Sequence, residues 1–200
     1  MNEVTTVKAA VVGASGYSGE ELVRLLLAHP HVELTAVTSR QYAGRSLADV
    51  FPRFGSRSSL VFSEPNTTSL EEAAEVIFLA LPHGVAAKFA RPLIKTGRTV
   101  IDLSADFRLN DAGVYAEFYG SPHPAPELLA KAVYGMPELH RDAIPGAQLI
   151  AAPGCYPTSI LLPIAPLLQA GLIKPTGIIA DSQSGVSGAG RKTDIPFLYA

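Results

Sequence analysis

The stretch VVGASGYSGEELVRLLL, residues 11–27, decides the fold of this chain. Its first two residues end a largely apolar run over residues 7–12, which predicts a strand. Most of its later residues belong to a segment over residues 20–28 whose apolar side chains recur with helical spacing, which predicts a helix. Between the two stand Gly13, Gly16 and Gly19, which predict a turn. Residues 32–38 predict a second strand, so the chain begins as strand, glycine turn, helix and strand.

The alternation of strand and helix continues along the chain. Further strands are predicted at residues 76–81, 99–103 and 148–152, and a helix at residues 84–95. Residues 40–70 predict a loop region with short elements, and residues 113–146, rich in proline and glycine, an irregular stretch. Strands that alternate with helices pair in parallel through right-handed crossovers, so we expect an α/β fold with a doubly wound parallel sheet. The order of its strands does not follow from the sequence.

After Pro153 the pattern changes. Residues 157–170 have helical character, but Pro163 and Pro166 fall inside them. Because an interior proline costs about 3 kcal/mol, we expect a kinked helix or two short pieces. Residues 178–181 predict one more strand, which is no domain by itself. The chain stops at Ala200 directly after an apolar run, and we expect it to be truncated within a second domain.

Composition limits the classes of partner. Among 200 residues, 16 basic and 18 acidic side chains give a formal charge of −2, which removes the general electrostatic argument for nucleic acid or membrane as partner. A single cysteine excludes an intrachain disulfide, and no basic segment followed by an apolar run opens the sequence, so we expect a cytoplasmic protein. The histidines, at positions 29, 31, 83, 123 and 140, lack metal-ligand spacing, and no metal is predicted.

The glycine turn indicates a dinucleotide site. In Gly13-Ala14-Ser15-Gly16-Tyr17-Ser18-Gly19 the glycines allow the backbone to approach a pyrophosphate, and the following helix offers unpaired N–H groups at its N-terminus. The spacing is GxxGxxG instead of GxGxxG, which weakens the match, whereas the hydroxyls of Ser15 and Ser18 add donors. The alternative is a tight turn that binds nothing.

The end of the second predicted strand distinguishes NAD from NADP. NAD sites place an acidic residue there, but Glu33 opens the strand, on the order of 15 Å from the required end at about 3.3 Å per residue. Thr38, Ser39 and Arg40 occupy that end, and hydroxyls with a guanidinium suit a 2′-phosphate. We therefore predict NADP, and the alternative for Arg40 alone is a solvated surface arginine.

Cys155 is the candidate nucleophile. It lies in PGCYPT, residues 153–158, after a predicted strand and before a segment in which Pro157 suits a first helical turn. The N-terminus of a helix favours the thiolate, which is the reactive form of cysteine. A lone cysteine is also often a small buried apolar residue, and the surrounding residues leave both interpretations open.

Together these segments resemble one enzyme family, the N-acetyl-γ-glutamyl-phosphate reductases. The resemblance runs through GASGYSGEELVRLL (13–26), TSRQYAG (38–44), LPHG (81–84), IDLSADFR (101–108), YGMPELHR (134–141), PGCYPT (153–158) and SGVSGAGR (184–191). It implies an NADP-binding Rossmann domain over residues 1–153. It also implies the beginning of an α+β substrate and oligomerisation domain over residues 154–200, in a homo-oligomer that is a dimer or tetramer.

The resemblance further implies a reaction, the NADPH-dependent reductive dephosphorylation of N-acetyl-glutamyl 5-phosphate to the semialdehyde in arginine biosynthesis. Cys155 matches the family's nucleophile. Its thiolate attacks the acyl carbon of the acyl phosphate, expels phosphate and leaves a thioester, which hydride from NADPH reduces to the aldehyde.

Other segments carry the remaining candidate site residues. Arg108, with Ser104 in the same segment, is the candidate for binding a phosphate or carboxylate of the substrate, and a helix-surface salt bridge is the alternative. The resemblance places Pro82-His83 near the cofactor, with a structural turn histidine as the alternative. Ser187-Gly188 belong to a glycine-rich segment that is expected to close on cofactor or substrate, unless it is a flexible loop.

Several alternatives stay open. The family's catalytic histidine is expected beyond Ala200 and none of the five histidines matches its motif, so the 200 residues can bind NADP and yet be inactive. An aspartate-semialdehyde dehydrogenase-like enzyme is the closest rival, although PGCYPT and LSADFR favour the acetylglutamyl enzyme. A rival from another class is a non-catalytic NADP-binding module, in which Cys155 packs or senses redox state.

Overall fold

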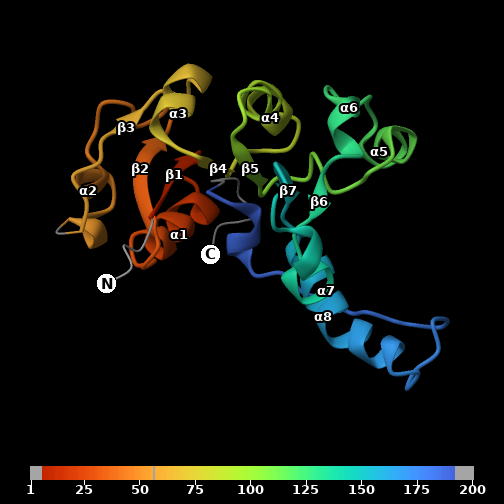
Figure 1. Ribbon diagram of the computed structural model, residues 1–200. Helices are drawn as coiled ribbons and strands as arrows, with labels where there is room; N and C mark the ends of the chain where they lie inside the picture. Colours follow the sequence, from red (N-terminus) through yellow and green to blue (C-terminus); the bar gives the residue numbers. More distant parts are fainter. Residues whose placement is uncertain (1–5, 56, 192–200) are drawn as a thin grey trace, which may run out of the picture.

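The computed structural model describes residues 6–55 and 57–191, and in this part of the chain the strands form one parallel sheet (Figure 1). The strands are β1 (Val7–Val12), β2 (Val32–Thr38), β3 (Phe62–Ser63), β4 (Val76–Leu79), β5 (Thr99–Asp102), β6 (Val133–Tyr134) and β7 (Leu149–Ala151). Their order is β3-β2-β1-β4-β5-β7-β6, and every neighbouring pair is parallel. The predicted α/β class is confirmed, and β1 and β4 lie side by side where the strand order reverses.

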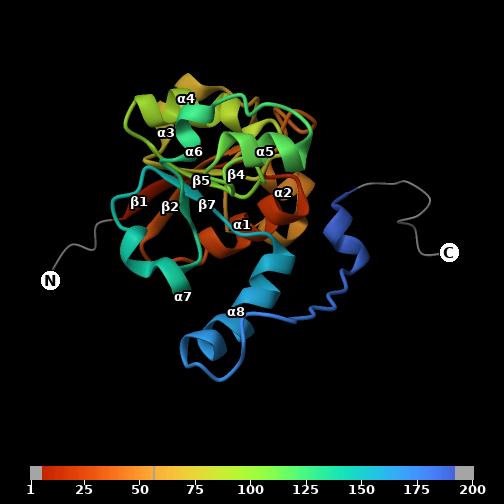
Figure 2. The same cartoon turned by 90° about the vertical axis from the view of Figure 1, so that its right-hand side faces the viewer.

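Helices cover both faces of the sheet, so the fold is doubly wound (Figure 2). They are α1 (Tyr17–Leu26), α2 (Leu47–Val50), α3 (Thr67–Ala73), α4 (Ala86–Lys95), α5 (Ala112–Tyr119), α6 (Pro126–Leu129), α7 (Pro137–His140) and α8 (Cys155–Gln169). Three short 3₁₀ helices, Pro52–Phe54, Arg141–Ala143 and Val186–Ala189, complete the described elements. Figure 2 shows α3, α4, α5 and α6 on one face and α1 and α7 on the other.

Two buried clusters follow from the alternation of side chains along the strands. In β1, Ala10 and Val12 enter the cluster beneath α4 and α5, whereas Val11 enters the cluster that contains Val23 of α1. Successive strand residues point to opposite faces, so a central strand must be apolar on both. The buried strands therefore match the apolar runs of the sequence, with boundaries displaced by a few residues.

The prediction of an irregular stretch over residues 113–146 was wrong. The segment contains most of α5 and all of α6, β6 and α7. At the start of α5, the Asp111 carboxylate accepts the N–H of Val114 at 2.8 Å, and at its end Gly120 adopts φ 73°, the left-handed conformation that ends helices. These two capping residues are the local signals of a helix that proline and glycine content obscured.

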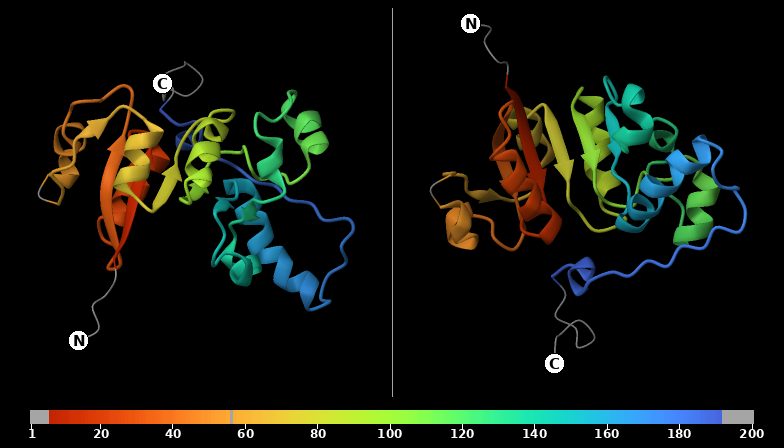
Figure 3. Two further views of the ribbon diagram at one scale, coloured as in Figure 1. Left: turned by 45° about the horizontal axis from the view of Figure 1, so that its top comes forward. Right: turned by 90° about the horizontal axis from the view of Figure 1, so that it is seen from below.

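The chain after β7 differs from its prediction in two ways. α8 is one helix of 15 residues that contains Pro163 and Pro166, not two short pieces. Ser159 and Leu162, whose carbonyls lose an intrahelical donor to these prolines, are exposed, so water can replace that donor. The strand predicted at residues 178–181 is absent from the described residues, where this segment pairs with no other strand. Figure 3 shows α8 and the following segment, in blue, standing away from the sheet.

The glycine turn fixes how closely α1 approaches the sheet. Gly13 has φ +80°, and a Cβ there would lie 2.3 Å from the Ala80 carbonyl oxygen. A Cβ on Gly19 would lie 2.3 Å from the Gly13 carbonyl oxygen. At Gly16 the nearest atom would be 3.7 Å away, an ordinary contact. Two of the three glycines are therefore required by packing within the chain.

We predict that Gly19→Ala destabilises the protein by about 3 kcal/mol, because the added methyl group displaces α1 from the backbone of the turn. Urea unfolding monitored by circular dichroism measures the change. Gly16→Ala is the matched control and should cost less than about 1 kcal/mol, the scale of an N-cap replacement. Equal stability of the two variants would contradict the packing explanation.

Candidate active site at the carboxyl edge of the sheet

Parallel pairing brings the candidate residues to one edge of the sheet. The carboxyl ends of all strands point to that edge, which in open α/β sheets is where ligands bind. The segments that leave it are Gly13–Gly19 after β1, residues 39–41 after β2, residues 80–85 after β4, residues 103–108 after β5 and residues 152–155 after β7. Every predicted site residue except Ser187 and Gly188 lies in one of these five segments.

The first turn of α1 leaves donors for an anion. Gly16 is its N-cap, with no side chain capping it, and the helix begins at Tyr17, three residues earlier than predicted. Tyr17, Ser18 and Gly19 are therefore the first helical residues, and their N–H groups have no acceptor within the helix. This end of the helix suits a pyrophosphate by its free N–H groups and its positive dipole.

The end of β2 is hydrogen-bonded to the glycine turn. The Ser15 and Ser39 hydroxyl oxygens are 2.8 Å apart, and the Gly13 N–H donates to Thr38 Oγ1 at 3.4 Å. Thr38 and Ser39 are buried, whereas Arg40 is exposed directly after them. Hydroxyl groups and a guanidinium thus follow the strand at the position where dinucleotide sites distinguish the two coenzymes.

A cavity of about 300 Å³ joins these segments. Five predicted residues line it, namely Gly13, Ser15, Ser39, Arg40 and Pro82. Sequence reasoning missed the rest of its lining, which is Gln41, Pro65, Leu81, Val85 and Phe89. The apolar members form a wall that suits the face of a planar ring, while the hydroxyls and guanidinium suit a ribose phosphate. Leu81 and Gln41 adjoin predicted residues, but the sequence has no local signal for Pro65.

His83 lies outside that cavity, held by a buried carboxylate. Its Nδ1 is 2.9 Å from Asp106 Oδ1, which also accepts the Gly84 N–H at 2.6 Å. The ring stacks on Tyr119 with centroids 4.5 Å apart, and Nε2 is 3.4 Å from the Tyr115 hydroxyl. Burial, with a smaller effect of the Asp106 charge, raises the pKa of Tyr115 to about 12, so this phenol stays protonated. These contacts favour a structural role for His83, and its contact with cofactor stays a prediction.

Ser104 links two buried carboxylates. Its hydroxyl donates to Asp102 Oδ2 at 2.8 Å and accepts the Asp106 N–H at 3.1 Å, while its own N–H donates to Asp102 Oδ1. Burial raises the pKa of Asp102 to about 6, although the Ser104 hydrogen bonds oppose the shift. With its hydroxyl engaged twice inside the turn, Ser104 positions the loop after β5, and its contact with substrate stays a prediction.

Arg108 and Cys155 lie close together after β5 and β7. Arg108 donates from Nε to the Ala152 carbonyl and from Nη2 to the Leu103 carbonyl, each at 2.9 Å. A Cβ on Gly154 would lie 3.0 Å from Arg108 Nη1, so the guanidinium adjoins the residue before Cys155. Arg108 lies in a loop and forms no ion pair with described residues, so the helix-surface salt bridge is wrong.

Cys155 is the first residue of α8 and is exposed. The alternative of a buried apolar filler is therefore wrong. Gly154 is the N-cap and makes no side-chain cap, so the first N–H groups of α8 lie beside the sulfur atom. An exposed thiol at the start of a helix has the environment in which cysteines react.

Ser187 and Gly188 belong to the 3₁₀ helix Val186–Ala189. Neither lines the cavity next to the glycine turn. Arg191, just after them, pairs with Glu20, and its guanidinium lies 4.5 Å from the centre of the Tyr17 ring. This attaches the segment to the first turn of α1, while its contact with cofactor or substrate stays a prediction.

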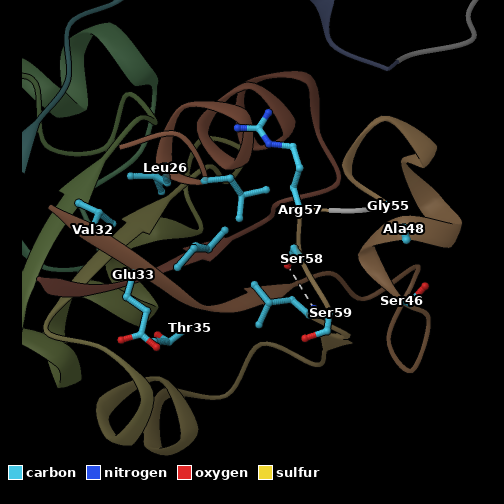
Figure 4. A pocket seen from close by; sticks show the side chains of 13 residues that line it. Leu26, Val32, Glu33, Thr35, Ser46, Ala48, Gly55, Arg57, Ser58 and Ser59 are labelled. Carbon is cyan, nitrogen blue, oxygen red and sulfur yellow. Dashed lines mark hydrogen bonds between the residues drawn. The ribbon is translucent and has the colours of Figure 1, made fainter. Parts of the chain in front are cut away.

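A larger cavity lies elsewhere. Its volume is about 1030 Å³, and it lies between the C-terminal end of α1, the start of β2, Gly55 and residues 57–60 (Figure 4). Glu33 lines it, as expected for a residue that opens β2 far from the glycine turn. Figure 4 shows the charged groups of Glu33 and Arg57 pointing apart, so these two charges do not converge on one point of the cavity.

Fold and site together define a dinucleotide-binding Rossmann domain of the oxidoreductase class, followed by a helix that begins at an exposed cysteine. Two family models match, "Semialdehyde dehydrogenase, NAD binding domain" over residues 8–147 and "Semialdehyde dehydrogenase, dimerisation domain" over residues 155–200. The chain belongs to the semialdehyde dehydrogenase family, and it contains the NAD-binding domain and the beginning of the dimerisation domain.

Curated relatives narrow the resemblance. The N-acetyl-gamma-glutamyl-phosphate reductase of Akkermansia muciniphila is 56% identical over 196 residues, and that of Desulfotalea psychrophila 54% over 193. Each match covers 96% of this chain and 56% of the relative, so the chain spans little more than half their length. The predicted resemblance to this family is confirmed.

Solved structures share the fold at low sequence identity. Aspartate semialdehyde dehydrogenase II of Vibrio cholerae has a TM-score of 0.62 at 18% identity, covering 83% of this chain and 47% of the other. The Candida albicans aspartate semialdehyde dehydrogenase with NADP has a TM-score of 0.56 at 17% identity, covering 83% and 48%. These likenesses support the architecture alone.

The described ranges, residues 6–55 and 57–191, contain neither a membrane-spanning helix nor a metal cluster. No helix there combines the length and apolar character that crossing a bilayer requires. No three His, Cys, Asp or Glu side chains of those residues gather in a metal-binding arrangement.

The raised pKa of Asp102 predicts a pH-dependent stability. The folded state holds the proton more tightly than the unfolded chain, so the free energy of unfolding falls as pH rises from about 4 to about 6, by up to about 3 kcal/mol. Asp102→Asn should flatten this slope and raise stability at neutral pH, as measured by urea unfolding across that range. The exposed Asp142→Asn is the control and should keep the slope. A wild-type slope in Asp102→Asn would contradict the assignment.

Proposed function

We propose that this chain is the cofactor-binding and nucleophile-bearing part of an NADP-dependent N-acetyl-γ-glutamyl-phosphate reductase of arginine biosynthesis. The observation that carries the proposal is the exposed Cys155 thiol at the start of α8, on the same edge of the sheet as the glycine turn. The names of the curated relatives support the substrate class.

Cys155 performs the covalent step in this proposal. Its thiolate attacks the acyl carbon of the acyl phosphate, the carbon–oxygen bond to phosphate breaks, and a thioester remains on the sulfur atom. The N–H groups at the start of α8 stabilise negative charge at this position. NADPH, when bound, supplies the hydride that reduces the thioester to the semialdehyde.

NADP fits the residues that surround the glycine turn. The space at Gly16 admits a close approach to the backbone, since the nearest atom outside its two chain neighbours, the Gly13 carbonyl oxygen, would lie 3.7 Å from a Cβ there. Ser39 and Arg40 would hold the 2′-phosphate, and the apolar wall of Leu81, Val85 and Phe89 would hold the adenine. The Candida albicans aspartate semialdehyde dehydrogenase, which shares the fold, is described as a crystal structure with NADP, and this agrees with the choice of NADP.

The organisation of the complete protein is part of the proposal. We assign residues 1–153 to the NADP-binding domain and residues 154–200 to the start of the substrate and oligomerisation domain, near the interval between the two family matches. The description of the second match as a dimerisation domain supports a homo-oligomer. A cytoplasmic location agrees with a biosynthetic enzyme in which these 200 residues contain one cysteine.

Replacement of the nucleophile tests the reaction. In the full-length enzyme we expect Cys155→Ser to abolish phosphate-dependent reduction of NADP by N-acetyl-glutamate semialdehyde, with NADPH binding retained, because serine lacks an activated thiolate. Absorbance at the nicotinamide band and fluorescence titration measure the two properties. Unchanged turnover would remove Cys155 from the covalent step, whereas absence of turnover in the unmutated full-length protein would favour the non-catalytic NADP-binding module, with Cys155 as a redox-sensing residue.

The same assay separates the rival enzyme. The fold likeness to aspartate semialdehyde dehydrogenases makes aspartate semialdehyde the second candidate substrate. We expect turnover of the acetylated glutamate compound, and turnover of aspartate semialdehyde alone would overturn the substrate assignment.

Coenzyme preference is tested at Arg40. Arg40→Ala should weaken NADPH binding about tenfold or more and leave NADH binding nearly unchanged, because the lost guanidinium contacts only the 2′-phosphate. Fluorescence titration of both coenzymes measures the change. Arg57→Ala, an exposed arginine at the opposite edge, is the matched control. Equal losses for both coenzymes would refute the role of Arg40.

A further inference from the structure

The segment that follows α8 returns to the sheet and meets it at the first turn of α1 (Figure 1). In the described part of the chain, every hydrogen bond or ion pair that joins residues 172–191 to residues before β7 is made by Arg191. Its Nη2 donates to Glu20 Oε2. The proposed reaction assigns no role to this contact, although it ties the chain after the nucleophile helix to the NAD-binding domain.

Three side chains from two separate elements surround the Arg191 guanidinium. Tyr17 and Glu20 belong to the start of α1, and Phe51 directly follows α2. The guanidinium carbon lies 4.5 Å from the centre of the Tyr17 ring and 5.5 Å from that of the Phe51 ring, both within the range of cation–π contacts. Phe51 is buried in the core. We call Tyr17, Glu20 and Phe51 the arginine slot, and the core position of Phe51 fixes one of its walls.

Glu20 is shared by two arginines. Its Oε1 lies 3.1 Å from Arg53 Nη2, while its Oε2 accepts the hydrogen bond from Arg191. An ordinary surface ion pair contributes little, because water and salt screen it. The Glu20 side chain is only 16% exposed, and it belongs to a network of one carboxylate with two guanidinium groups. Screening by water is therefore weaker here, and the slot has the chemistry to hold an arginine in one position.

The arginine slot shares the first turn of α1 with the proposed pyrophosphate site. The Glu20 N–H donates to the Gly16 carbonyl at 2.8 Å and is the first N–H of α1 that is bonded within the helix. The three N–H groups before it, beginning with that of Tyr17, are available to a phosphate. Tyr17 thus offers its backbone to the coenzyme and its ring to Arg191. A segment held on this ring lies beside the turn that the coenzyme must leave.

We propose that Glu20 is a positioning residue, which holds residues 184–191 on the first turn of α1 through Arg191 and thereby slows release of the coenzyme. The inference rests on the proposed function for the identity of that coenzyme. Charge and position predict opposite effects when the carboxylate is removed. Repulsion between Glu20 and a coenzyme phosphate predicts slower release without the carboxylate, whereas loss of the held segment predicts faster release.

Glu20→Gln in the full-length enzyme tests both parts of the proposal. Hydrogen–deuterium exchange without coenzyme should be about fivefold faster at residues 184–191, because the segment loses its ion pair and opens more often. The hydrogen-bonded N–H groups of Gly188 and Gly190 report this opening. Stopped-flow fluorescence should show NADPH dissociating about threefold faster, the direction that position predicts and charge does not.

Glu21→Gln is the matched control. It removes the same charge from the next residue of α1, where the carboxylate pairs with Arg24 instead of the returning segment. Exchange at residues 184–191 and NADPH dissociation should stay as in the unmutated enzyme. Arg191→Met should speed the exchange as much as Glu20→Gln does, and the double variant should exchange no faster than either, because both changes remove one contact. Circular dichroism spectra verify that each variant folds.

Two results would overturn the proposal. Unchanged exchange at residues 184–191 in Glu20→Gln and Arg191→Met would remove the positioning role, and unchanged or slower NADPH dissociation in Glu20→Gln would remove the effect on release. Failure of the proposed function has a different signature. An unmutated enzyme that does not bind NADPH would refute that function and the effect on release, while the exchange experiment, which uses no coenzyme, would still decide whether Glu20 holds the segment.

Discussion

Parallel strand direction is the constraint from which the rest of the structure follows. Because every pair in the described sheet is parallel, the segments after β1, β2, β4, β5 and β7 leave the same edge. Residues as distant in sequence as Gly13, Arg40 and Cys155 thereby share one side of the molecule. The reversal of strand order between β1 and β4 leaves room for a ligand there, and the cavity beside Gly13 occupies that position.

Two buried carboxylates, those of Asp102 and Asp106, position the loops at the carboxyl edge of the sheet, and burying them costs some stability. Asp106 accepts hydrogen bonds from the segment after β4, and Asp102 is bridged to it by Ser104. A core built only from apolar residues could not bind loop N–H groups in this way, because an unpaired backbone donor inside a protein is costly. Asp102, with its pKa raised to about 6, carries the desolvation cost of that arrangement. His83 receives its orientation from the same network.

The sequence predicted the parts of the fold that depend on local pattern. The apolar runs identified β1, β2, β4, β5 and β7, and the glycine spacing identified the turn before α1. Strand order was beyond reach because it depends on contacts between distant segments. α5 was missed because its caps, Asp111 and Gly120, were hidden in a stretch rich in proline and glycine. The strand expected at residues 178–181 failed because a strand forms only beside a partner.

The glycines of the turn and the exposed Arg40 lie near the same cofactor cavity, but they differ in their freedom to change during evolution. Gly13 and Gly19 touch backbone atoms of the chain itself, so selection for folding preserves them whatever coenzyme the protein uses. Arg40 is exposed, lies after the end of β2, and has no ion-pair partner among the described residues. A lineage could therefore exchange one nicotinamide coenzyme for the other through mutations at this surface loop while the architecture beneath it is inherited intact.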